Sequence, residues 1–220
     1  MCTSLTWKVL TIAELGWLGD AFDTSESAMY SFNMQAVDEA FIELIQANQG
    51  PGGDVPVAVP RAIPEGNSCA DIAWTSAFPQ LAWLLYTYYG DERELRRQWP
   101  SLQRYTENLL RDAGVTADGL AECDQYSDWM CGVVEENEGN RRGCCTTPPE
   151  AGLCPVARMM GSLGYIEALG AMANMARVQH LHDESTRYES LKDDATRLYH
   201  QAFWNEALET YGPPPPLRVS

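Results

Sequence analysis

Residues 73–89 read AWTSAFPQLAWLLYTYY, and residues 92–112 read ERELRRQWPSLQRYTENLLRD. The first run is apolar almost all round, and Gly90 follows it as a stop signal, so it predicts a helix that is buried on most sides. The second run gathers its apolar residues into one stripe between Arg, Glu and Gln, which predicts an amphipathic helix facing solvent. Pro100 is expected to break or restart this second helix, because an internal proline removes a backbone hydrogen bond.

Helical patterns also occur on both sides of this pair. Thr24 or Ser25 is predicted to cap a helix whose apolar positions recur until a stop at Gly50. Further along, residues 156–176 are rich in Met, Ala and Gly, which suits close packing, whereas residues 184–204 alternate apolar and charged side chains. The sequence thus predicts inner-type and outer-type helices in alternation.

This alternation fits two architectures. It is what two concentric layers of helices require, and a helical-repeat scaffold gives the same signature. A scaffold has short and uniform turns, whereas residues 51–67 and 118–150 form long loops without helical periodicity, and the loops before the buried helices carry Asp, Glu and Trp. No stretch sustains the alternation of a sheet. We therefore predict an all-α toroid with a pocket, with a helical interaction scaffold as the alternative.

The composition restricts the partners of this protein. Fifteen Lys and Arg stand against thirty-one Asp and Glu in 220 residues, which gives a formal net charge of −16. Phosphate backbones and anionic lipid surfaces would be repelled, so we expect neither nucleic acid nor membrane as a partner. Seven Trp and ten Tyr beside many carboxylates suit uncharged ligands such as sugars.

The cysteines and the N-terminus carry no signal for a metal site, a redox site or export. None of the seven cysteines has the Cys-x-x-Cys spacing of a zinc or redox site, so no metal and no cofactor are predicted. Five of them lie between Cys123 and Cys154, where disulfides and free thiols are both open, with free thiols favoured. The segment Met1–Ala13 lacks the apolar core of a signal peptide, and no apolar run is long enough to span a bilayer, so the cytoplasm is the default location.

One string carries the sharpest chemical signal. Residues 14–21 read ELGWLGDA, in which Gly16 and Gly19 are expected to turn the backbone tightly and present Trp17 and Asp20 together. Sugar binding uses this pairing, because an aromatic face covers the C–H side of a sugar and a carboxylate accepts its hydroxyl groups. On the string alone, a capped turn with an ordinary core tryptophan is the competing interpretation.

Further motifs extend the pattern in order along the chain. They are DVPVAVP at residues 54–60, AWTSA at 73–77 with YGD at 89–91, and YSDW at 126–129. Together with the ELGWLGDA string they make the chain resemble the catalytic domain of bacterial and fungal α-L-rhamnosidases. This resemblance implies a six-hairpin (α/α)6 barrel that removes terminal α-L-rhamnose from glycosides with inversion. One carboxylic acid would protonate the leaving oxygen and one carboxylate would activate water, with no essential metal.

The resemblance also assigns roles to single residues. It makes Trp17 an aromatic wall of a rhamnose pocket and Asp20 a carboxylate that binds the sugar hydroxyl groups. Trp74 and Trp129 match aromatic positions that close the same pocket, and Asp128 matches the acidic partner of the second. The competing interpretation of each tryptophan is core packing.

The chain departs from the family pattern at the acid and at both ends. The register of the family's general acid holds Ala13, and Glu14, one position later, is the remaining candidate for a catalytic acid. We expect an unmatched segment at 1–13, a partial six-hairpin domain at 14–210 and a disordered Pro-rich tail at 211–220. The expected fold is therefore the first half of a toroid, a fragment without its acid and base that could self-associate through the cut face of the barrel. A sugar-binding remnant without activity is the alternative to an enzyme.

Overall fold

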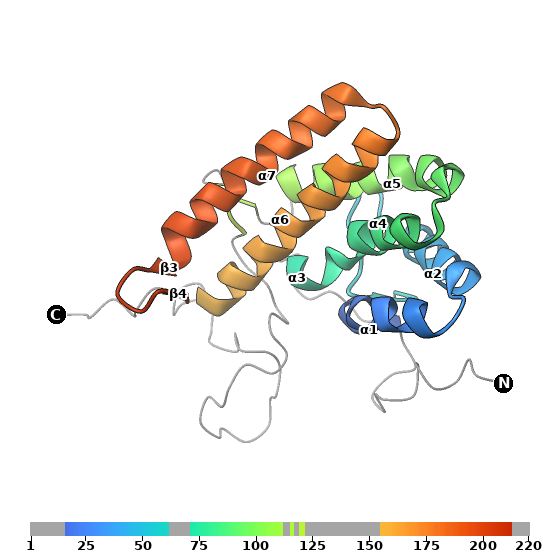
Figure 1. Ribbon diagram of the computed structural model, residues 1–220, viewed down its shortest axis with the longest axis horizontal. Coiled ribbons are helices and arrows are strands. Elements are labelled where there is room, and N and C mark those ends of the chain that lie inside the picture. The colour runs from blue at the N-terminus through green and yellow to red at the C-terminus, as the bar shows by residue number, and fades with distance from the viewer. Residues whose placement is uncertain (1–15, 62–70, 112–114, 117–118, 122–154, 213–220) are drawn as a thin grey trace, which may run out of the picture.

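The computed structural model describes residues 16–61, 71–111, 115–116, 119–121 and 155–212. Helices and two very short antiparallel strand pairs follow one another along these residues (Figure 1). In chain order the elements are β1 (Gly16–Trp17), α1 (Leu18–Ser31), α2 (Gln35–Ala47), β2 (Ala58–Val59), α3 (Ile72–Thr75), α4 (Ala77–Tyr89), α5 (Glu92–Arg111), α6 (Pro155–Val178), α7 (His182–Phe203), β3 (Trp204–Asn205) and β4 (Thr210–Tyr211).

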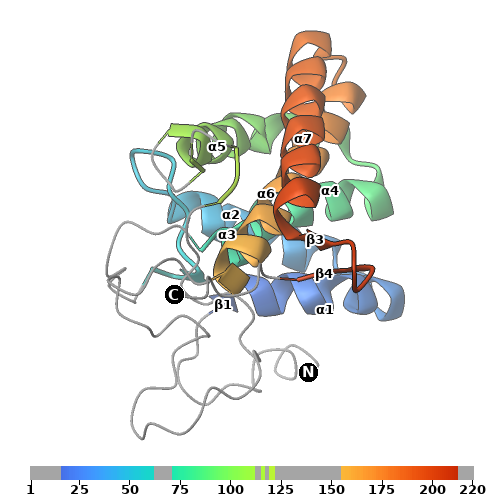
Figure 2. The same cartoon turned by 90° about the vertical axis from the view of Figure 1, so that its left-hand side faces the viewer.

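The longer helices form two layers of three. Helices α1, α4 and α6 lie next to one another in that order, with α4 in contact with both of its neighbours. Helix α2 packs on α4, α5 packs on α4 and α6, and α7 packs along α6 (Figure 2). Each inner helix is followed by an outer one after a short link, at residues 32–34, 90–91 and 179–181. The prediction of an all-α protein with alternating inner and outer helices is confirmed.

Helix α4 is the centre of this arrangement. Phe78, Leu81, Ala82 and Leu85 are 0–3% exposed, because α4 meets other helices on most of its sides. Gly90 ends the helix in the left-handed conformation, with φ of 69°, and its N–H donates to the Tyr86 carbonyl. A residue with a β-carbon would be strained there, so the predicted stop at Gly90 is confirmed.

The prediction of a break at Pro100 is wrong. Helix α5 continues through Pro100, which lies on the exposed side of the helix together with Arg96. The carbonyl of Arg96 loses its intrahelical partner to the proline, and on this side water can replace it. Leu95, Trp99 and Leu102 bury the opposite stripe and hold both halves of the helix on the same core.

The single helix predicted from Thr24 or Ser25 to Gly50 is also wrong. Two helices occupy this stretch, and Thr24 and Ser25 lie inside α1, where their hydroxyl groups donate to carbonyls one turn earlier. The chain bends at residues 32–34, where the Met34 N–H donates to the Tyr89 hydroxyl of α4. That contact joins residues 55 positions apart, so local periodicity could not reveal it.

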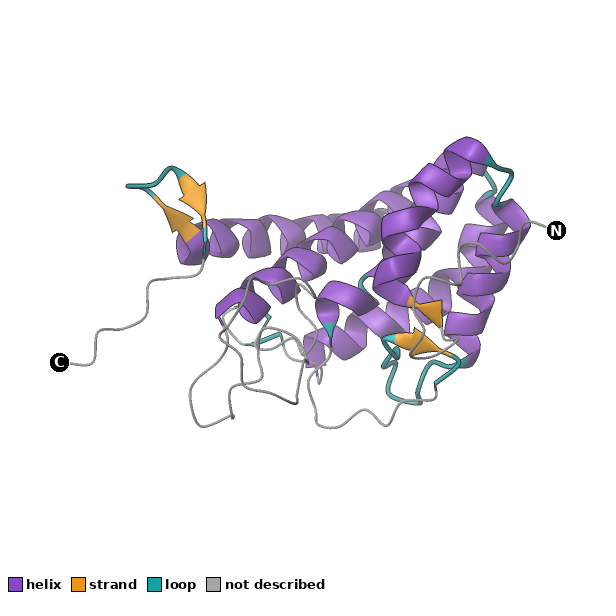
Figure 3. Ribbon diagram, turned by 90° about the horizontal axis from the view of Figure 1, so that it is seen from below, coloured by secondary structure: helices purple, strands orange, loops and turns teal. Residues whose placement is uncertain are grey.

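The C-terminal described residues form a small hairpin seen from below in Figure 3. Strand β3 pairs with β4 through Trp204 and Tyr211, and the hydroxyl of Tyr211 lies 2.9 Å from Nδ1 of His200 on α7. Tyr211 therefore belongs to a hairpin and not to a tail. Residues 1–13 and 213–220 lie outside the described part of the chain, and the division into domains stays a prediction.

Among the helices that the structure describes, none is long and apolar enough to cross a membrane.

Asp38 is a buried acid in the outer helix α2. Asp38 is only 8% exposed, and its Oδ2 has no hydrogen-bond partner among the described residues. Burial raises the pKa of Asp38 to about 6, because the charged form loses its water. The folded state therefore favours the protonated form, and this contribution to stability is lost as the pH rises through 6.

We expect Asp38→Asn to stabilise the protein at pH 8 by about 2–3 kcal/mol, the free energy equivalent of the raised pKa. At pH 4 the wild-type carboxyl is protonated in the folded state, so the two proteins should differ little. Chemical denaturation at both pH values measures this, with Asp193→Asn on an exposed face of α7 as the control. An equal effect of Asp38→Asn at both pH values would contradict a buried titrating acid.

Candidate functional site

The predicted pocket residues lie at the start of helix α1. Strand β1 pairs with β2, so that Trp17 faces Ala58, and the Leu18 N–H donates to the Val57 carbonyl at 2.9 Å. Val57 and Ala58 are buried residues of the long loop that follows α2. This loop therefore fixes the position at which α1 begins and with it the place of Trp17.

Trp17 meets Trp74, which comes from helix α3. The two rings are 5.6 Å apart between centroids and inclined by 74°, an edge-to-face arrangement that aromatic rings favour. Both residues are half-buried. The structure thus brings together two of the three tryptophans that the sequence assigned to one pocket.

Gly19 makes this pairing possible. A β-carbon at this position would lie 3.0 Å from two ring carbons of Trp74, closer than nearly all real contacts. The sequence predicted that Gly16 and Gly19 form a tight turn, and this is wrong, because Gly16 lies in β1 and Gly19 in the first turn of α1. Gly19 is needed for the close approach of the indole ring, a reason that only the tertiary contact reveals.

Helix α3 is a single turn that its surroundings hold in place. The Asp71 carbonyl accepts hydrogen bonds from the backbone N–H groups of Trp74 and Thr75 and from the Thr75 hydroxyl. The same hydroxyl lies 3.0 Å from the Tyr105 hydroxyl of α5, and both groups are buried. Tyr105, to which sequence reasoning gave no role beyond the core, therefore anchors the helix that carries Trp74.

Asp20 lies three residues after Trp17, in the first turn of α1, and is exposed. Loss of water around the carboxyl raises the pKa of Asp20, the charge of Asp23 adds to this, and a hydrogen bond from the residue's own backbone N–H opposes it. A carboxylate at a helix N-terminus is favoured by the helix dipole. The exposed Asp20 carboxylate can therefore accept hydrogen bonds from the hydroxyl groups of a ligand.

The remaining predicted site residues are not placed. Glu14, Asp128 and Trp129 lie outside the residues that the structure describes, as do all seven cysteines. Within the described ranges, no group of three His, Cys, Asp or Glu could hold a metal ion. The roles predicted for these three residues stay predictions.

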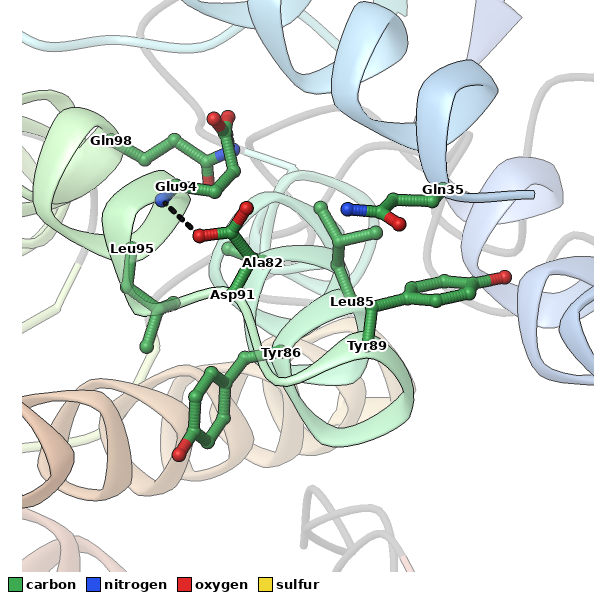
Figure 4. Close-up of a pocket in the computed structure, with 9 residues that line it drawn as sticks. All are labelled: Gln35, Ala82, Leu85, Tyr86, Tyr89, Asp91, Glu94, Leu95 and Gln98. Atoms are coloured by element: carbon green, nitrogen blue, oxygen red, sulfur yellow. Dashed lines mark hydrogen bonds between the residues drawn. The ribbon is translucent and has the colours of Figure 1, made fainter. Parts of the chain in front are cut away.

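Two acids of the other motifs make contacts with residues close to them in the sequence. Asp54 forms a 2.7 Å ion pair with Arg61 within the loop that follows α2. Asp91 accepts hydrogen bonds from the N–H groups of Arg93 and Glu94 at the start of α5, and the Arg93 side chain lowers the pKa of Asp91 to about 2. Asp91 lines a hollow between α2, α4 and α5 at the C-terminal end of α4 (Figure 4), whereas Trp74 lies in α3, which precedes the N-terminal end of that helix.

Comparison with known proteins places these elements in a class of helical glycosidase domains. Solved α-L-rhamnosidase structures share the fold. That of Dictyoglumus thermophilum has a TM-score of 0.71 at 22% identity and is matched over 89% of this chain and 20% of its own. That of Streptomyces avermitilis, complexed with L-rhamnose, has a TM-score of 0.67 at 21% identity, over 88% of this chain and 16% of its own.

The sequence comparison agrees with the structural one. The family described as the bacterial alpha-L-rhamnosidase 6 hairpin glycosidase domain matches residues 13–212, and this chain belongs to that family. The α-L-rhamnosidases of Formosa agariphila and of Alteromonas sp. are both 26% identical to it, over 89% and 88% of the chain. The chain spans about a fifth of the length of these two relatives. The six longer described helices form three pairs, each with an inner helix followed by an outer one, and cover part of a six-hairpin domain.

We expect Gly19→Ala to destabilise the protein by about 1 kcal/mol, because the new methyl group collides with the Trp74 ring. Helix propensity alone would favour alanine by up to about 1 kcal/mol, so the sign of the change reports on the contact. Gly170→Ala in α6 is the matched control, since its β-carbon would meet only Lys192 Cδ at an ordinary 3.6 Å. Chemical denaturation should show opposite signs for the two variants, and two gains in stability would contradict the close approach.

Proposed function

We propose that this chain carries the rhamnose-binding wall of an α-L-rhamnosidase that hydrolyses terminal α-L-rhamnose from glycosides with inversion. The observation that supports this most directly is the edge-to-face pair of Trp17 and Trp74 beside the first turn of α1, which holds Asp20. The tryptophans offer aromatic surface to the C–H groups of the sugar, and Asp20 accepts hydrogen bonds from its hydroxyl groups. A rhamnosylated glycoside is therefore the proposed partner.

The chemistry of inversion requires two carboxyl groups on opposite sides of the scissile bond. One gives a proton to the leaving oxygen, and the other removes a proton from the attacking water. Glu14, three residues before Trp17, is the candidate for the acid, and Asp128 and Trp129 are proposed to complete the sugar pocket. Asp20 is given the binding role, in which it stays charged and accepts hydrogen bonds from the sugar.

A sugar-binding protein without hydrolysis is the second candidate. It is favoured by one observation, the Ala13 that stands in the register of the family's general acid. This candidate uses the same tryptophans and the same Asp20 as the enzyme, so sugar binding supports both proposals and only turnover separates them. A helical scaffold, in contrast, would bind no sugar here.

We expect Asp20→Ala to weaken the binding of L-rhamnose about tenfold or more, since a hydrogen bond to a charged group is lost. Titration calorimetry or ligand-observed NMR measures the affinity. Asp23→Ala is the matched control, because Asp23 is another exposed acid of α1 to which no sugar contact is assigned, and its removal should leave the affinity unchanged. No binding by the wild-type chain would favour the scaffold, and equal losses in the two variants would count against a specific role of Asp20.

We expect the wild-type chain, if it is an enzyme, to release rhamnose from an aryl α-L-rhamnoside and to lose this activity in Glu14→Gln. The substitution removes the proton that Glu14 would give to the leaving oxygen. Rhamnose release measured alongside rhamnose binding separates the two candidates. Binding without release in the wild type would favour the sugar-binding protein, and release that survives Glu14→Gln would remove Glu14 from the mechanism.

A further inference from the structure

Helix α3, which carries Trp74, lies between two helices that each approach it with a glycine. On one side is Gly19 of α1, under the Trp74 ring. On the other side is Gly164 of α6, where a β-carbon would lie 2.9 Å from the Ile72 carbonyl oxygen, 2.9 Å from Ser76 Oγ and 3.0 Å from the Ala73 Cα. These three contacts span the turn that contains Trp74.

The atoms facing Gly164 cannot move aside individually. The Ile72 carbonyl accepts the Ser76 N–H at 2.9 Å, and the Ser76 hydroxyl accepts Gln80 Nε2 at 3.1 Å. Ile72 and Ser76 are fully buried. Two of the contacts are to backbone atoms, so no change of side-chain rotamer relieves them. Any group larger than hydrogen at position 164 must displace α3 as a unit.

A displaced α3 would carry Trp74 with it. The turn is tied on its other side through Thr75 to Tyr105 of α5, and the Trp74 ring rests on Gly19 without spare room. We infer that Gly164 is a positioning residue, which sets the distance between α6 and α3 and thereby the orientation of Trp74 against Trp17. Its consequence for rhamnose binding rests on the proposed function, whereas its effect on the tryptophan pair does not.

Helix α6 is held in place by several neighbours, so α3 is the element that moves when the two collide. Two residues before Gly164, the fully buried Ser162 accepts a hydrogen bond from the Ala121 N–H at 3.0 Å. Helix α6 also packs along α7 (Figure 1). Because α6 is held on several sides, a clash at Gly164 is relieved by the short helix α3.

The test reads the geometry of the tryptophan pair without any ligand. Two indole rings 5.6 Å apart couple their electronic transitions and give paired circular dichroism bands whose size depends on distance and angle. The spectrum of Trp74→Phe subtracted from that of the wild type identifies these bands. We expect Gly164→Ala to reduce them by half or more while the protein keeps a cooperative melt. The matched control Gly170→Ala, on the same helix, should leave them unchanged.

A measurement of L-rhamnose binding separates this inference from the proposed function. If the wild-type chain binds L-rhamnose, Gly164→Ala should weaken binding about tenfold and Gly170→Ala should not. If the wild type binds none, the proposed function fails and the circular dichroism bands alone decide the inference. Should Gly164→Ala not melt cooperatively, the wild type and all variants are measured in sucrose, which stabilises folded states. Unchanged bands in a folded Gly164→Ala protein would overturn the inference.

Discussion

The arrangement of the described helices depends on the burial of helix α4. Its apolar side chains point in nearly all directions, so their removal from water requires a neighbour on almost every side. Helices α1 and α6 flank it within the inner layer, and α2 and α5 cover it from outside. The two-layer order of the described helices follows from this single requirement, because each outer helix needs to bury only one stripe.

The candidate site is a product of the same packing. Trp17 comes from the strand that precedes α1, and Trp74 from the one-turn helix that leads into α4. They meet because α1 and α6 each approach α3 more closely than a helix with a side chain at the contact would allow. Glycine at positions 19 and 164 removes the side chain where the approach is tightest. Packing and the geometry of the candidate site are therefore linked in this region, since the contacts that close the core also orient the pair of Trp17 and Trp74.

Much of the fold could be predicted from the sequence, and the errors have identifiable physical causes. Periodicity located α5, α6 and α7 to within a few residues, because each presents a long and consistent pattern. It merged α3 and α4 into one helix at 73–89, because the apolar run continues across the junction at Ser76. It missed the bend between α1 and α2, since the Tyr89 hydroxyl that holds it lies far along the chain. The sequence reasoning overestimated the effect of Pro100 on α5. The loss of one hydrogen bond on the solvent face costs little stability when the buried stripe of the helix stays intact.

For the candidate site, the sequence by itself determined the membership in the rhamnosidase family and the choice of Trp17, Asp20 and Trp74. A fixed order of short motifs can be recognised in a sequence without any knowledge of distances. Only the tertiary structure decided how Trp17 and Trp74 are placed relative to each other and why positions 19 and 164 hold glycine. It also showed that Asp54 pairs with Arg61 and that Asp91 accepts N–H groups at the start of α5. The reason is that a clash depends on atoms from other helices, and no pattern within one segment records where those atoms lie.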